Sequence, residues 1–370
     1  MSKDSYDEWD FLFLGPIDSV YTQSLWHAAA TLLSKGKLNR NILSINWPTY
    51  PIVSCGYHQV VSQVVDLDYC SINNIPVIRR AVGGGAVFLD SNQLFYHFIW
   101  HNETPNIPRN ISGIFKTLLE PVVQTYKDFG VDAVYKPVND ILAKNRKISG
   151  NGAGMFDYAQ VLVGNFILDF PRQEMARILR VPDEKFRDKV YKSLQAGISS
   201  FKDELGYIPN REEIVKVFKG NLEKMLGISL IDDALDPQIE KGMIELKTRY
   251  LTDEWLYETD ERGKKLIEAV KIHSSLNVAQ GMYKSQGGLI RAICEFRDSV
   301  IQDILLSGDF WITRGKLPKL ENYLKGFNLE NSNLTNKIQR FFDKEACETS
   351  GTSADDIAQA IHNTFKSLKR

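Results

Sequence analysis

The alternation of apolar and polar positions divides the first half of the chain into short helices and strands. Residues 19–34 repeat apolar side chains at helical spacing, and Gly36 follows as a stop signal. Helices are also predicted over about 64–72 and 109–128. Short β-rich runs bounded by turn residues predict strands that begin near Asn41, Pro51, Pro76, Gly85, Gln93, Val138, Arg146 and Ala159. Because strands often follow one another directly, the fold class is α+β, with mixed, largely antiparallel sheets and flanking helices.

The second half changes character twice. From about 172 to 250 the pattern is helical and charged. The run ETDERGKK from Glu258 is polar with few apolar positions, so we predict a linker there and a boundary between domains 1–257 and 258–370. Beyond it, two strands from Gly287 and Val300 with a turn near Arg297 and helices over about 316–368 predict a small α+β domain.

Composition narrows the class of protein. The 370 residues are 43% apolar and 25% charged with a net charge of −1, which suits two folded domains and excludes a broadly basic nucleic-acid-binding surface. No apolar run reaches the roughly 18 residues of a membrane span, and the start MSKDSYDEWD is acidic, so we expect no membrane association and a cytoplasmic location. The widely spaced Cys55, Cys70, Cys294 and Cys347 are expected to be buried thiols.

One segment combines cations with consecutive glycines. In IRRAVGGGAVFLD, from Ile78 to Asp90, Gly83–Gly85 lack β-carbons, so their backbone can approach a ligand and direct N–H groups at phosphate oxygens. Arg79 and Arg80 add donor forks that suit phosphate. The run fits neither the Walker nor the dinucleotide glycine pattern. A glycine-rich hairpin with a solvated arginine pair is the structural alternative.

A second segment, KPVNDILAKNRKISGNGAG from Lys136, adds a carboxylate and a lysine. Asn139 and Asp140 begin a predicted strand, and Asp140 is a plausible magnesium ligand. Lys147 begins the next strand, before a run of glycines that we expect to be a flexible loop. A lysine there could neutralise charge on a phosphate and on a carboxyl oxygen, as an acyl-phosphate transition state requires. A surface lysine in a hairpin is the alternative.

Together, RRAVGGGAVF and, about 50 residues later, NDILAKNRKISG resemble the lipoate–protein ligase family, whose pattern is RRxxGGGxVxHD followed by ND(L/I) and KxSG. The order of strands and helices around them is similar, and TRYLTDEW from Thr248 resembles the end of that family's catalytic domain. The tail with GGLIRAICEF and ILLSGDFW resembles the family's accessory domain, which in some archaea is a separate subunit. The resemblance covers most of the chain.

The resemblance implies a biotin/lipoyl ligase-like fold and a two-step reaction. Lipoate would attack the α-phosphate of magnesium-bound ATP to give lipoyl-AMP and pyrophosphate, and a lysine of a lipoyl carrier would then accept the acyl group. Lys147 would contact both the α-phosphate and the acyl carbonyl and is the implied catalytic residue, and Asp140 would help to hold Mg²⁺. The implied nucleotide-binding residues are Arg79, Arg80, Gly83, Gly84, Gly85, Ala86, Val87, Phe88, Asn139 and Lys147. Lipoate would contact Lys147 and Gly84, with Arg79 and Gly83 shaping the site beside the acyl chain.

The resemblance also implies partners. The carrier would be a 2-oxoacid dehydrogenase subunit, a glycine-cleavage H protein or a specialised lipoate-binding protein. A fused accessory domain removes one reason for a second subunit, so we expect a monomer. We further expect the accessory domain to serve adenylate formation more than transfer from preformed lipoyl-AMP.

The chain departs from the family pattern at three places. Leu89 and Val163 stand where the family usually has histidines, which predicts a more apolar site. Either acyl specificity changes or one half-reaction slows, and the alternative is that both histidines are dispensable hydrogen-bond partners. The segment DKVYKSLQAGISSF from Asp188 lacks the usual arginine-containing ending of the adenylate-binding loop, although Lys189 and Lys192 could cover the nucleotide.

Three alternatives remain at the level of sequence. An octanoyl or lipoyl transferase of the same fold uses a cysteine nucleophile, which in those relatives lies about 15 residues before the lysine; Asp132–Lys147 contains no cysteine. A biotin ligase would need a GRGRxxxG-type loop, which is absent. A non-catalytic protein that binds lipoate or its carrier is a third possibility, suggested by the replaced histidines.

Overall fold

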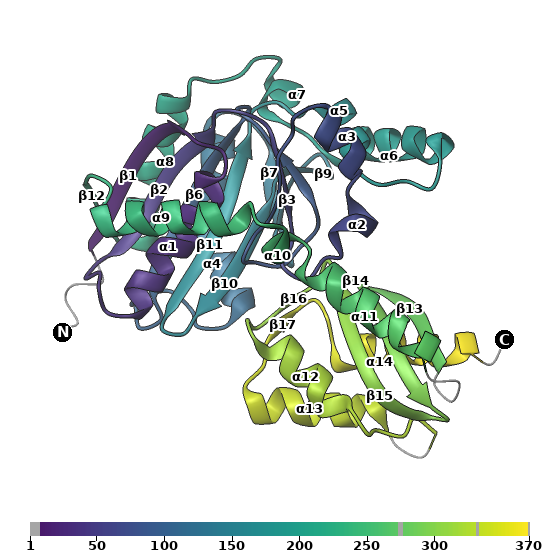
Figure 1. Cartoon of the computed structure of the whole chain (residues 1–370). Coiled ribbons are helices and arrows are strands. Elements are labelled where there is room, and N and C mark those ends of the chain that lie inside the picture. Colours follow the sequence, from purple (N-terminus) through teal and green to yellow (C-terminus); the bar gives the residue numbers. More distant parts are fainter. Residues whose placement is uncertain (1–7, 273–276, 331–332, 369–370) are drawn as a thin grey trace. The chain divides into compact units, whose positions relative to one another are not determined.

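The chain forms two compact units. The computed structural model describes residues 8–272, 277–330 and 333–368 (Figure 1). The first unit comprises Met1–Ser54, Val65–Arg80 and Val87–Leu251, and the second comprises Cys55–Val64, Ala81–Ala86 and Thr252–Arg370. Two short segments of the N-terminal half, one of which holds the glycine run, therefore group with the C-terminal part of the chain. The boundary between residues 257 and 258 stays a prediction.

A six-stranded sheet forms the centre of the first unit. Its order is β10 (Asn151–Phe156), β11 (Ala159–Ile167), β6 (Gln93–His101), β2 (Asn41–Pro48), β1 (Glu8–Ile17) and β12 (Ser229–Asp232). β1 is parallel to β2 and to β12, whereas β2, β6, β11 and β10 pair antiparallel. The predicted mixed, largely antiparallel architecture is confirmed.

Two small sheets carry the motifs of the first unit. One has the order β4 (Val77–Arg79), β3 (Ile52–Cys55) and β5 (Val87–Leu89), and it flanks the glycine run in sequence. The other is a meander of β7 (Ala133–Lys136), β8 (Asp140–Ala143) and β9 (Arg146–Ser149). The predicted hairpin turn lies between β8 and β9, where Lys144 and Asn145 have positive φ angles of 47° and 63°.

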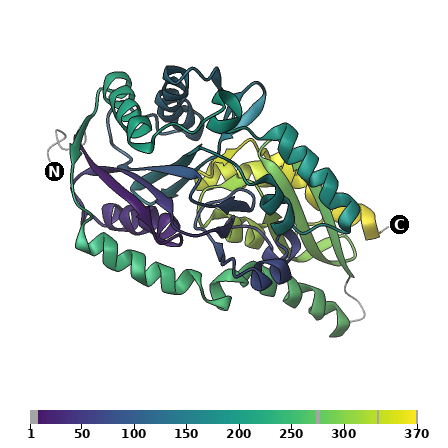
Figure 2. The ribbon, with the colours of Figure 1, turned by 90° about the horizontal axis from the view of Figure 1, so that it is seen from above.

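Helices cover both faces of the central sheet. On one face, α4 (Ile111–Asp128) packs beside α8 (Arg211–Leu226), and the Phe218 ring contacts Tyr96, Phe98 and Phe166. On the other face, α1 (Tyr21–Ser34) packs through Trp26 and His27 against Phe156. α9 (Pro237–Tyr250) runs beside α1 (Figures 1 and 2), close enough that a Cβ on Gly242 would lie 3.0 Å from Ala28 Cβ.

Further helices belong to the first unit. They are α3 (Leu67–Ile72), α5 (Arg172–Ile178), α6 (Glu184–Gly197) and α7 (Phe201–Leu205). α5 packs against both α3 and α6. The segment between α6 and α7 reaches β9, which matters for the position of Lys147.

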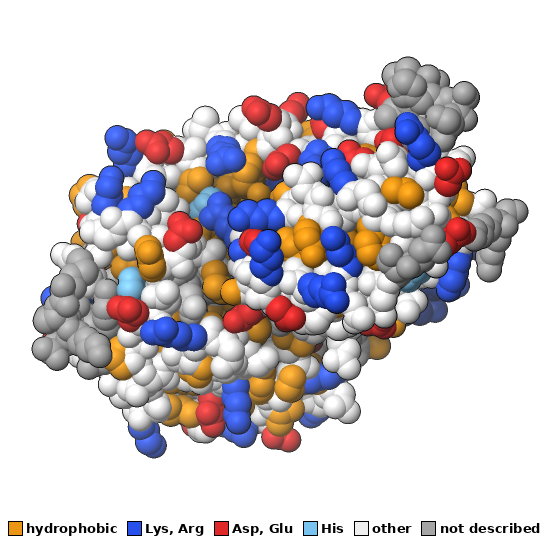
Figure 3. All heavy atoms as spheres, turned by 90° about the horizontal axis from the view of Figure 1, so that it is seen from below, with side chains coloured by type: hydrophobic (Ala, Val, Ile, Leu, Met, Phe, Trp, Pro, Cys, Tyr) orange, Lys and Arg blue, Asp and Glu red, His pale blue; other side chains and the backbone are white. Residues whose placement is uncertain are grey.

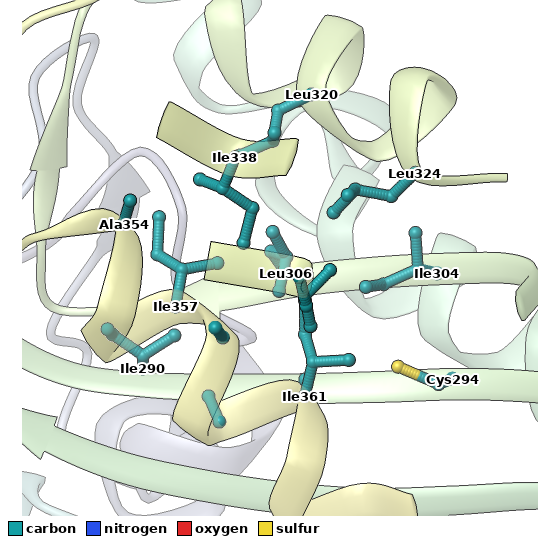
Figure 4. Close-up of a cluster of buried hydrophobic side chains, with 14 of the residues drawn as sticks. Ile290, Cys294, Ile304, Leu306, Leu320, Leu324, Ile338, Ala354, Ile357 and Ile361 are labelled. Carbon is teal, nitrogen blue, oxygen red and sulfur yellow. The ribbon is translucent and has the colours of Figure 1, made fainter. Parts of the chain in front are cut away.

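The second unit is built on an antiparallel sheet of β13 (Asn277–Ser285), β14 (Gly288–Arg297) and β15 (Val300–Gly308). Side chains alternate between its faces: Ile293 and Leu305 pack with Leu266 of α11 (Glu258–Ile272), whereas Ile290, Cys294 and Leu306 belong to the main core. Figure 4 shows that core closed by α12 (Lys316–Leu324), α13 (Leu334–Glu345) and α14 (Ala354–Leu368). The remaining elements are α2 (Val61–Val64), α10 (Asp253–Leu256), β16 (Trp311–Ile312) and β17 (Thr349–Ser350).

Two sequence predictions were wrong. The polar run from Glu258 is the start of helix α11, stabilised by Leu266 on the sheet and by an exposed Glu261–Lys264 pair at 2.6 Å. The glycine run after Lys147 is strand β10, in which Gly152 and Gly154 pair with Val163 and Val161. The neighbouring strand supplies the hydrogen bonds that local propensity does not indicate. β1, β7, β12 and β13 were not anticipated.

The surface and cysteines match what composition indicated. Lys and Arg side chains are interspersed with Asp and Glu on the face drawn in Figure 3, and all four cysteines are buried thiols that form no disulfide. Within the described part of the chain, no helix has the length and apolar character to cross a bilayer.

Candidate active site

Lys147 is held by its backbone on both sides. It lies on β9, where it pairs with Leu142 of β8, and it forms a parallel bridge with Ile198 at the end of α6. Its carbonyl oxygen accepts a 2.8 Å hydrogen bond from the Ser199 N–H. The side chain is about one-third exposed. A fixed backbone with an accessible ammonium is what a group needs to meet a ligand in a defined position.

The Lys147 ammonium forms an ion pair with Asp140. Lys147 Nζ lies 2.6 Å from Asp140 Oδ1, and both side chains are partly exposed, at 37% and 34%. The neighbouring Asn139 exchanges hydrogen bonds with Asn151 of β10, through Asn139 Nδ2 to the Asn151 carbonyl at 2.5 Å and Asn151 Nδ2 to the Asn139 carbonyl at 3.1 Å. The structure therefore brings three of the predicted site residues, Asn139, Asp140 and Lys147, to one place.

A buried amide pair lies beside this lysine. A Cβ on Gly150 would come within 3.6 Å of Lys147 Cε and 3.7 Å of Asn165 Oδ1. Asn165 Oδ1 accepts the Gly150 N–H at 2.9 Å, and Asn165 Nδ2 donates to Gln93 Oε1 at 2.8 Å. The lysine stem and an amide that is fixed by two hydrogen bonds therefore both lie next to Gly150. Asn165 and Gln93 were not singled out from the sequence.

The polar face of the central sheet continues past this amide pair to a buried histidine. His97, on β6, pairs in register with Val163 of β11 and with Ser44 of β2. Burial lowers the pKa of the fully buried His97 to about 3, so the ring is neutral at physiological pH. Leu89 is buried on β5, opposite Ile52. Although Leu89 and Val163 replace family histidines, the expected loss of polarity is offset next to Val163 by His97.

The two arginines of the glycine motif are buried. Arg79 ends β4 with no exposed surface, and Arg80 is 8% exposed, with its Nη1 donating to the Ser54 carbonyl at 2.7 Å. A solvated arginine pair is therefore excluded. After the glycines, Val87 and Phe88 lie on β5, with Val87 at the surface and Phe88 buried. A buried guanidinium group is stable only when hydrogen-bond acceptors or carboxylates surround it, so both arginine side chains are held in fixed positions.

The glycine run belongs to the second unit and is packed tightly there. A Cβ on Gly83 would lie 2.7 Å from the Phe310 carbonyl oxygen, and a Cβ on Gly56 would lie 1.8 Å from the Gly84 carbonyl oxygen. Gly84 has a φ of 100°, which only glycine adopts readily. Apart from its two chain neighbours, no atom of the described residues lies within 4 Å of a Cβ built on Gly85. Close packing explains why position 83 is a glycine, and the positive φ explains why position 84 is one. Of the three glycines, Gly85 alone has room for a side chain.

A neighbouring loop supports the glycine run from within the same unit. The Tyr57 N–H donates to the Val82 carbonyl at 2.9 Å. His58 accepts at its carbonyl from Gly308 N–H at 3.0 Å and stacks on Phe310, with ring centroids 5.7 Å apart and nearly parallel.

Two carboxylates of the C-terminal segment fix the same loop. Gln59 Nε2 donates to Asp309 Oδ1 at 2.8 Å, and the Asp260 carboxylate accepts from the N–H groups of Val61 and Ser62 at 2.9 Å each. C-terminal residues therefore set the conformation of the loop that contacts the glycine run.

The predicted residues thus form two groups. Asn139, Asp140, Lys147, Arg79, Arg80, Val87 and Phe88 belong to the first unit, whereas Gly83, Gly84, Gly85 and Ala86 belong to the second. Lys189 and Lys192 lie on α6. Among residues 8–272, 277–330 and 333–368, no group of three or more His, Cys, Asp or Glu could hold a metal ion by itself. Asp140 offers one hard oxygen donor, which suits Mg²⁺ only when a ligand's phosphates supply further oxygens.

The first group can meet an anion. Asp140 positions the Lys147 ammonium beside the fixed Asn165 amide, and the ammonium stays partly exposed. It can therefore neutralise negative charge that develops on a ligand oxygen. Asp140 can also release the ammonium to a stronger anion, since exposed ion pairs are weak.

Known proteins with similar sequences catalyse acyl attachment. Residues 25–223 match the model of the lipoyl protein ligase A/B catalytic domain. Lipoate-protein ligase A subunit 1 of Thermoplasma acidophilum is 31% identical over 214 residues, covering 55% of this chain and 79% of that protein. An octanoyltransferase LipM of Halalkalibacterium halodurans is 24% identical over 277 residues, covering 67% of this chain and 98% of that protein.

Solved structures agree with these relatives. An archaeal bi-partite lipoate protein ligase from Thermoplasma acidophilum, described with its E2 lipoyl domain, matches with a TM-score of 0.60 and 27% identity, covering 68% of this chain and 96% of that chain. A lipoate-protein ligase A described as bound with ATP matches with a TM-score of 0.56 and 25% identity, covering 67% and 98%. With more than half of its length matched by the family model, the chain belongs to the lipoyl protein ligase A/B family of enzymes.

Proposed function

We propose that the chain is an ATP-dependent lipoate–protein ligase that forms lipoyl-AMP and transfers the lipoyl group to a lysine of a carrier domain. The observation that carries the proposal is the ion pair of Lys147 with Asp140 at 2.6 Å, next to the fixed Asn165 amide. Adenylate formation places negative charge on the acyl and α-phosphate oxygens, and an accessible lysine is suited to stabilising both.

Cysteine chemistry supports a ligase over a transferase. A transferase of this fold needs a thiolate nucleophile, but burial raises the pKa of Cys70 and of Cys347 to about 11 and that of Cys294 to about 12. Cys55 has no exposed surface. Because a buried thiol with a raised pKa is a poor nucleophile at neutral pH, none of the four cysteines is suited to hold an acyl group.

The proposed reaction has two balanced steps. In the first, a lipoate carboxylate oxygen bonds to the α-phosphorus of ATP as the bond to pyrophosphate breaks, and Lys147 balances charge on the reacting oxygens. In the second, the amine of a carrier lysine attacks the acyl carbonyl, AMP leaves and the amine loses a proton. Asp140 orients Lys147, and with the nucleotide phosphates it would hold Mg²⁺, which supplies further charge neutralisation when bound.

The remaining roles follow the same assignment. Gly85, with open space at its α-carbon, would allow close approach of the phosphates. Ala86 and, on β5, Val87 and Phe88 would contact the nucleotide. The carrier would be a lipoyl domain of a 2-oxoacid dehydrogenase, a glycine-cleavage H protein or a specialised lipoate-binding protein. The reaction needs no second subunit, because the C-terminal segment that supports the glycine run is part of the same chain.

An assay with a purified lipoyl domain tests the proposal. One reaction contains free lipoate, ATP and Mg²⁺, and the other contains an octanoylated carrier protein without ATP. We expect mass spectrometry to detect an acylated lipoyl domain only in the first reaction, with release of pyrophosphate. Acylation only in the second reaction would establish an octanoyltransferase instead, and acylation in neither, with lipoate bound, would favour a binding protein.

A further inference from the structure

Three polar side chains form a buried cluster on the face of the central sheet that α1 covers. Ser44 and Asn46 of β2 and His97 of β6 have at most traces of exposed surface. Ser44 Oγ lies 3.1 Å from His97 Nδ1, and Asn46 Nδ2 lies 3.4 Å from the same nitrogen. Such a cluster is costly in a sheet core unless its polar atoms are satisfied.

The cluster leaves one donor and one acceptor without a partner. Because the Asn46 amide NH₂ can only donate, His97 Nδ1 accepts, and the neutral ring carries its proton on Nε2. Within the described residues, neither His97 Nε2 nor Asn46 Oδ1 has a hydrogen-bond partner, although both atoms are buried. An unmade hydrogen bond of a buried group destabilises the folded chain, so an arrangement that retains two of them points to a ligand.

The cluster continues the polar surface that begins at Lys147. Asn165, whose amide lies beside the lysine, pairs in register with Phe95 of β6, and Phe95 also pairs with Asn46 of β2. The rings of Phe95 and His97 are 6.1 Å apart. His97 lies two residues farther along β6, a distance of roughly 7 Å along the strand. β2, β6 and β11 are adjacent strands (Figure 1), so the step from Asn165 to His97 on this face is shorter than an extended eight-carbon acyl chain.

We propose that His97, held by Asn46, forms the distal acyl subsite and selects lipoate over octanoate by recognising the sulfur atoms of the dithiolane. The inference rests on the proposed function, which places the carboxylate of the acid at Lys147. The His97 Nε2–H donates to a ring sulfur, a weak acceptor, and the Phe95 ring adds a sulfur–aromatic contact. In dihydrolipoate, a thiol S–H can donate to Asn46 Oδ1. The methyl end of octanoate cannot accept a hydrogen bond from His97 Nε2–H, so its binding leaves this donor unpaired.

Direct binding measurements on the intact chain test the subsite. Isothermal titration calorimetry compares lipoate with octanoate for the unaltered protein, His97→Leu and His97→Gln. We expect the unaltered protein to bind lipoate more tightly, and His97→Leu to weaken lipoate about tenfold without weakening octanoate. His97→Gln retains an N–H donor and is expected to fall between the two. His101→Leu, on the same strand and face but at the partly exposed end of β6, is the matched control and should change neither affinity.

Several outcomes overturn the inference. The unaltered protein could bind lipoate and octanoate with equal affinity, or bind neither acid. The His97→Leu variant could lose affinity for both acids alike, or keep its affinity for lipoate. Thermal melts check that the variants fold. Adenylate formation is assayed in parallel to separate the two proposals. If lipoyl-AMP forms but selectivity does not depend on His97, only the subsite is wrong. If selectivity depends on His97 but no adenylate forms, the ligase assignment is wrong.

Discussion

At the scale of single residues, one buried carboxylate anchors the hairpin that presents Lys147. Glu204 of α7 has only 3% of its side chain exposed and lies 2.9 Å from Lys144 Nζ and 2.6 Å from Arg146 Nη2. Ser199 Oγ donates to the same carboxylate at 2.5 Å. Ser199 is also the residue whose N–H binds the Lys147 carbonyl. Glu204 therefore connects the β8–β9 turn, β9 and the start of α7 through one charge.

This anchor makes the stability of the first unit depend on pH. Burial pushes the pKa of Glu204 up, but the hydrogen bond from Ser199 and the pairing with Lys144 and Arg146 outweigh it, and the net pKa is lowered. Because the pKa of Glu204 is lower in the folded than in the unfolded chain, its ionised carboxylate stabilises the fold at pH values above the unfolded-state pKa. This stabilisation is lost as the pH falls below about 4. We expect Glu204→Gln to destabilise by about 1–3 kcal/mol at pH 7, a difference that shrinks near pH 3 in thermal melts.

A matched variant separates the buried charge from its exposed partner. Lys144 is 70% exposed, so Lys144→Ala is expected to change stability much less than Glu204→Gln. An equal loss at pH 3 and pH 7 for Glu204→Gln would show that packing, and not ionisation, explains its effect.

Motif spacing singled out Lys147, Asp140 and Asn139 as candidates, because a lysine and a carboxylate in adjacent short strands are visible in the sequence. It did not locate His97, Asn46 or Asn165. Their position depends on the register between β2, β6 and β11, which pairs residues far apart in the chain. One signal was available: Gln93, Phe95 and His97 alternate along a strongly apolar run, so the two polar residues fall on one face.

At the scale of elements, different structural constraints act on the three consecutive glycines, Gly83–Gly85. Gly83 lies against the Phe310 carbonyl, Gly84 has a positive φ, and Gly85 faces open space. The sequence indicated a phosphate-binding loop for all three. Contacts from segments more than two hundred residues away in the chain, which sequence patterns do not reveal, account for Gly83.

Alanine substitutions distinguish these roles. Gly83→Ala forces a shift against backbone and should destabilise the second unit by about 1–3 kcal/mol, seen as a lower melting temperature. Gly85→Ala should leave the melting temperature unchanged and raise the KM for ATP, because a methyl group would project toward the proposed phosphates. The interpretation is wrong if Gly85→Ala destabilises as much as Gly83→Ala, or if Gly85→Ala leaves ATP kinetics unchanged.

The errors of element prediction have the same physical origin. Helix α11 begins in a run that is polar enough to suggest a linker, yet Leu266 and the sheet behind it fix the helix. Strand β10 contains glycines that favour a loop, but pairing with β11 determines its conformation. By contrast, α1 and strands β2, β6, β14 and β15 carry their own periodic patterns and were predicted close to their observed bounds.

At the scale of the whole molecule, the glycine run is structurally part of the C-terminal unit. Asp260, Asp309 and Phe310 support the loop at residues 56–62, and Phe310 also contacts Gly83. Under the proposed function, the C-terminal segment therefore acts on the step that uses ATP. This gives a physical reason for the sequence-based expectation that an accessory domain serves adenylate formation.

The two half-reactions are expected to respond differently when that support is removed. Truncation before Thr252 removes all three supporting residues, and Asp309→Ala removes one in the full-length chain. Both should reduce lipoate-dependent ATP–pyrophosphate exchange more than they reduce transfer from synthetic lipoyl-AMP to a lipoyl domain, with the larger effect in the truncation. Equal loss in both half-reactions for the folded Asp309→Ala variant would contradict this account.

The central claim, that Lys147 stabilises adenylate formation, is tested most directly by ATP–pyrophosphate exchange in Lys147→Ala. Lys144→Ala is the control, because it removes a lysine of the same hairpin that pairs with Glu204 and not with Asp140. We predict that Lys147→Ala lowers lipoate-dependent exchange at least a hundredfold, as removal of a transition-state charge partner does, while its melting temperature stays near that of the unaltered protein and Lys144→Ala retains near-normal exchange. Near-normal exchange in Lys147→Ala would contradict the account.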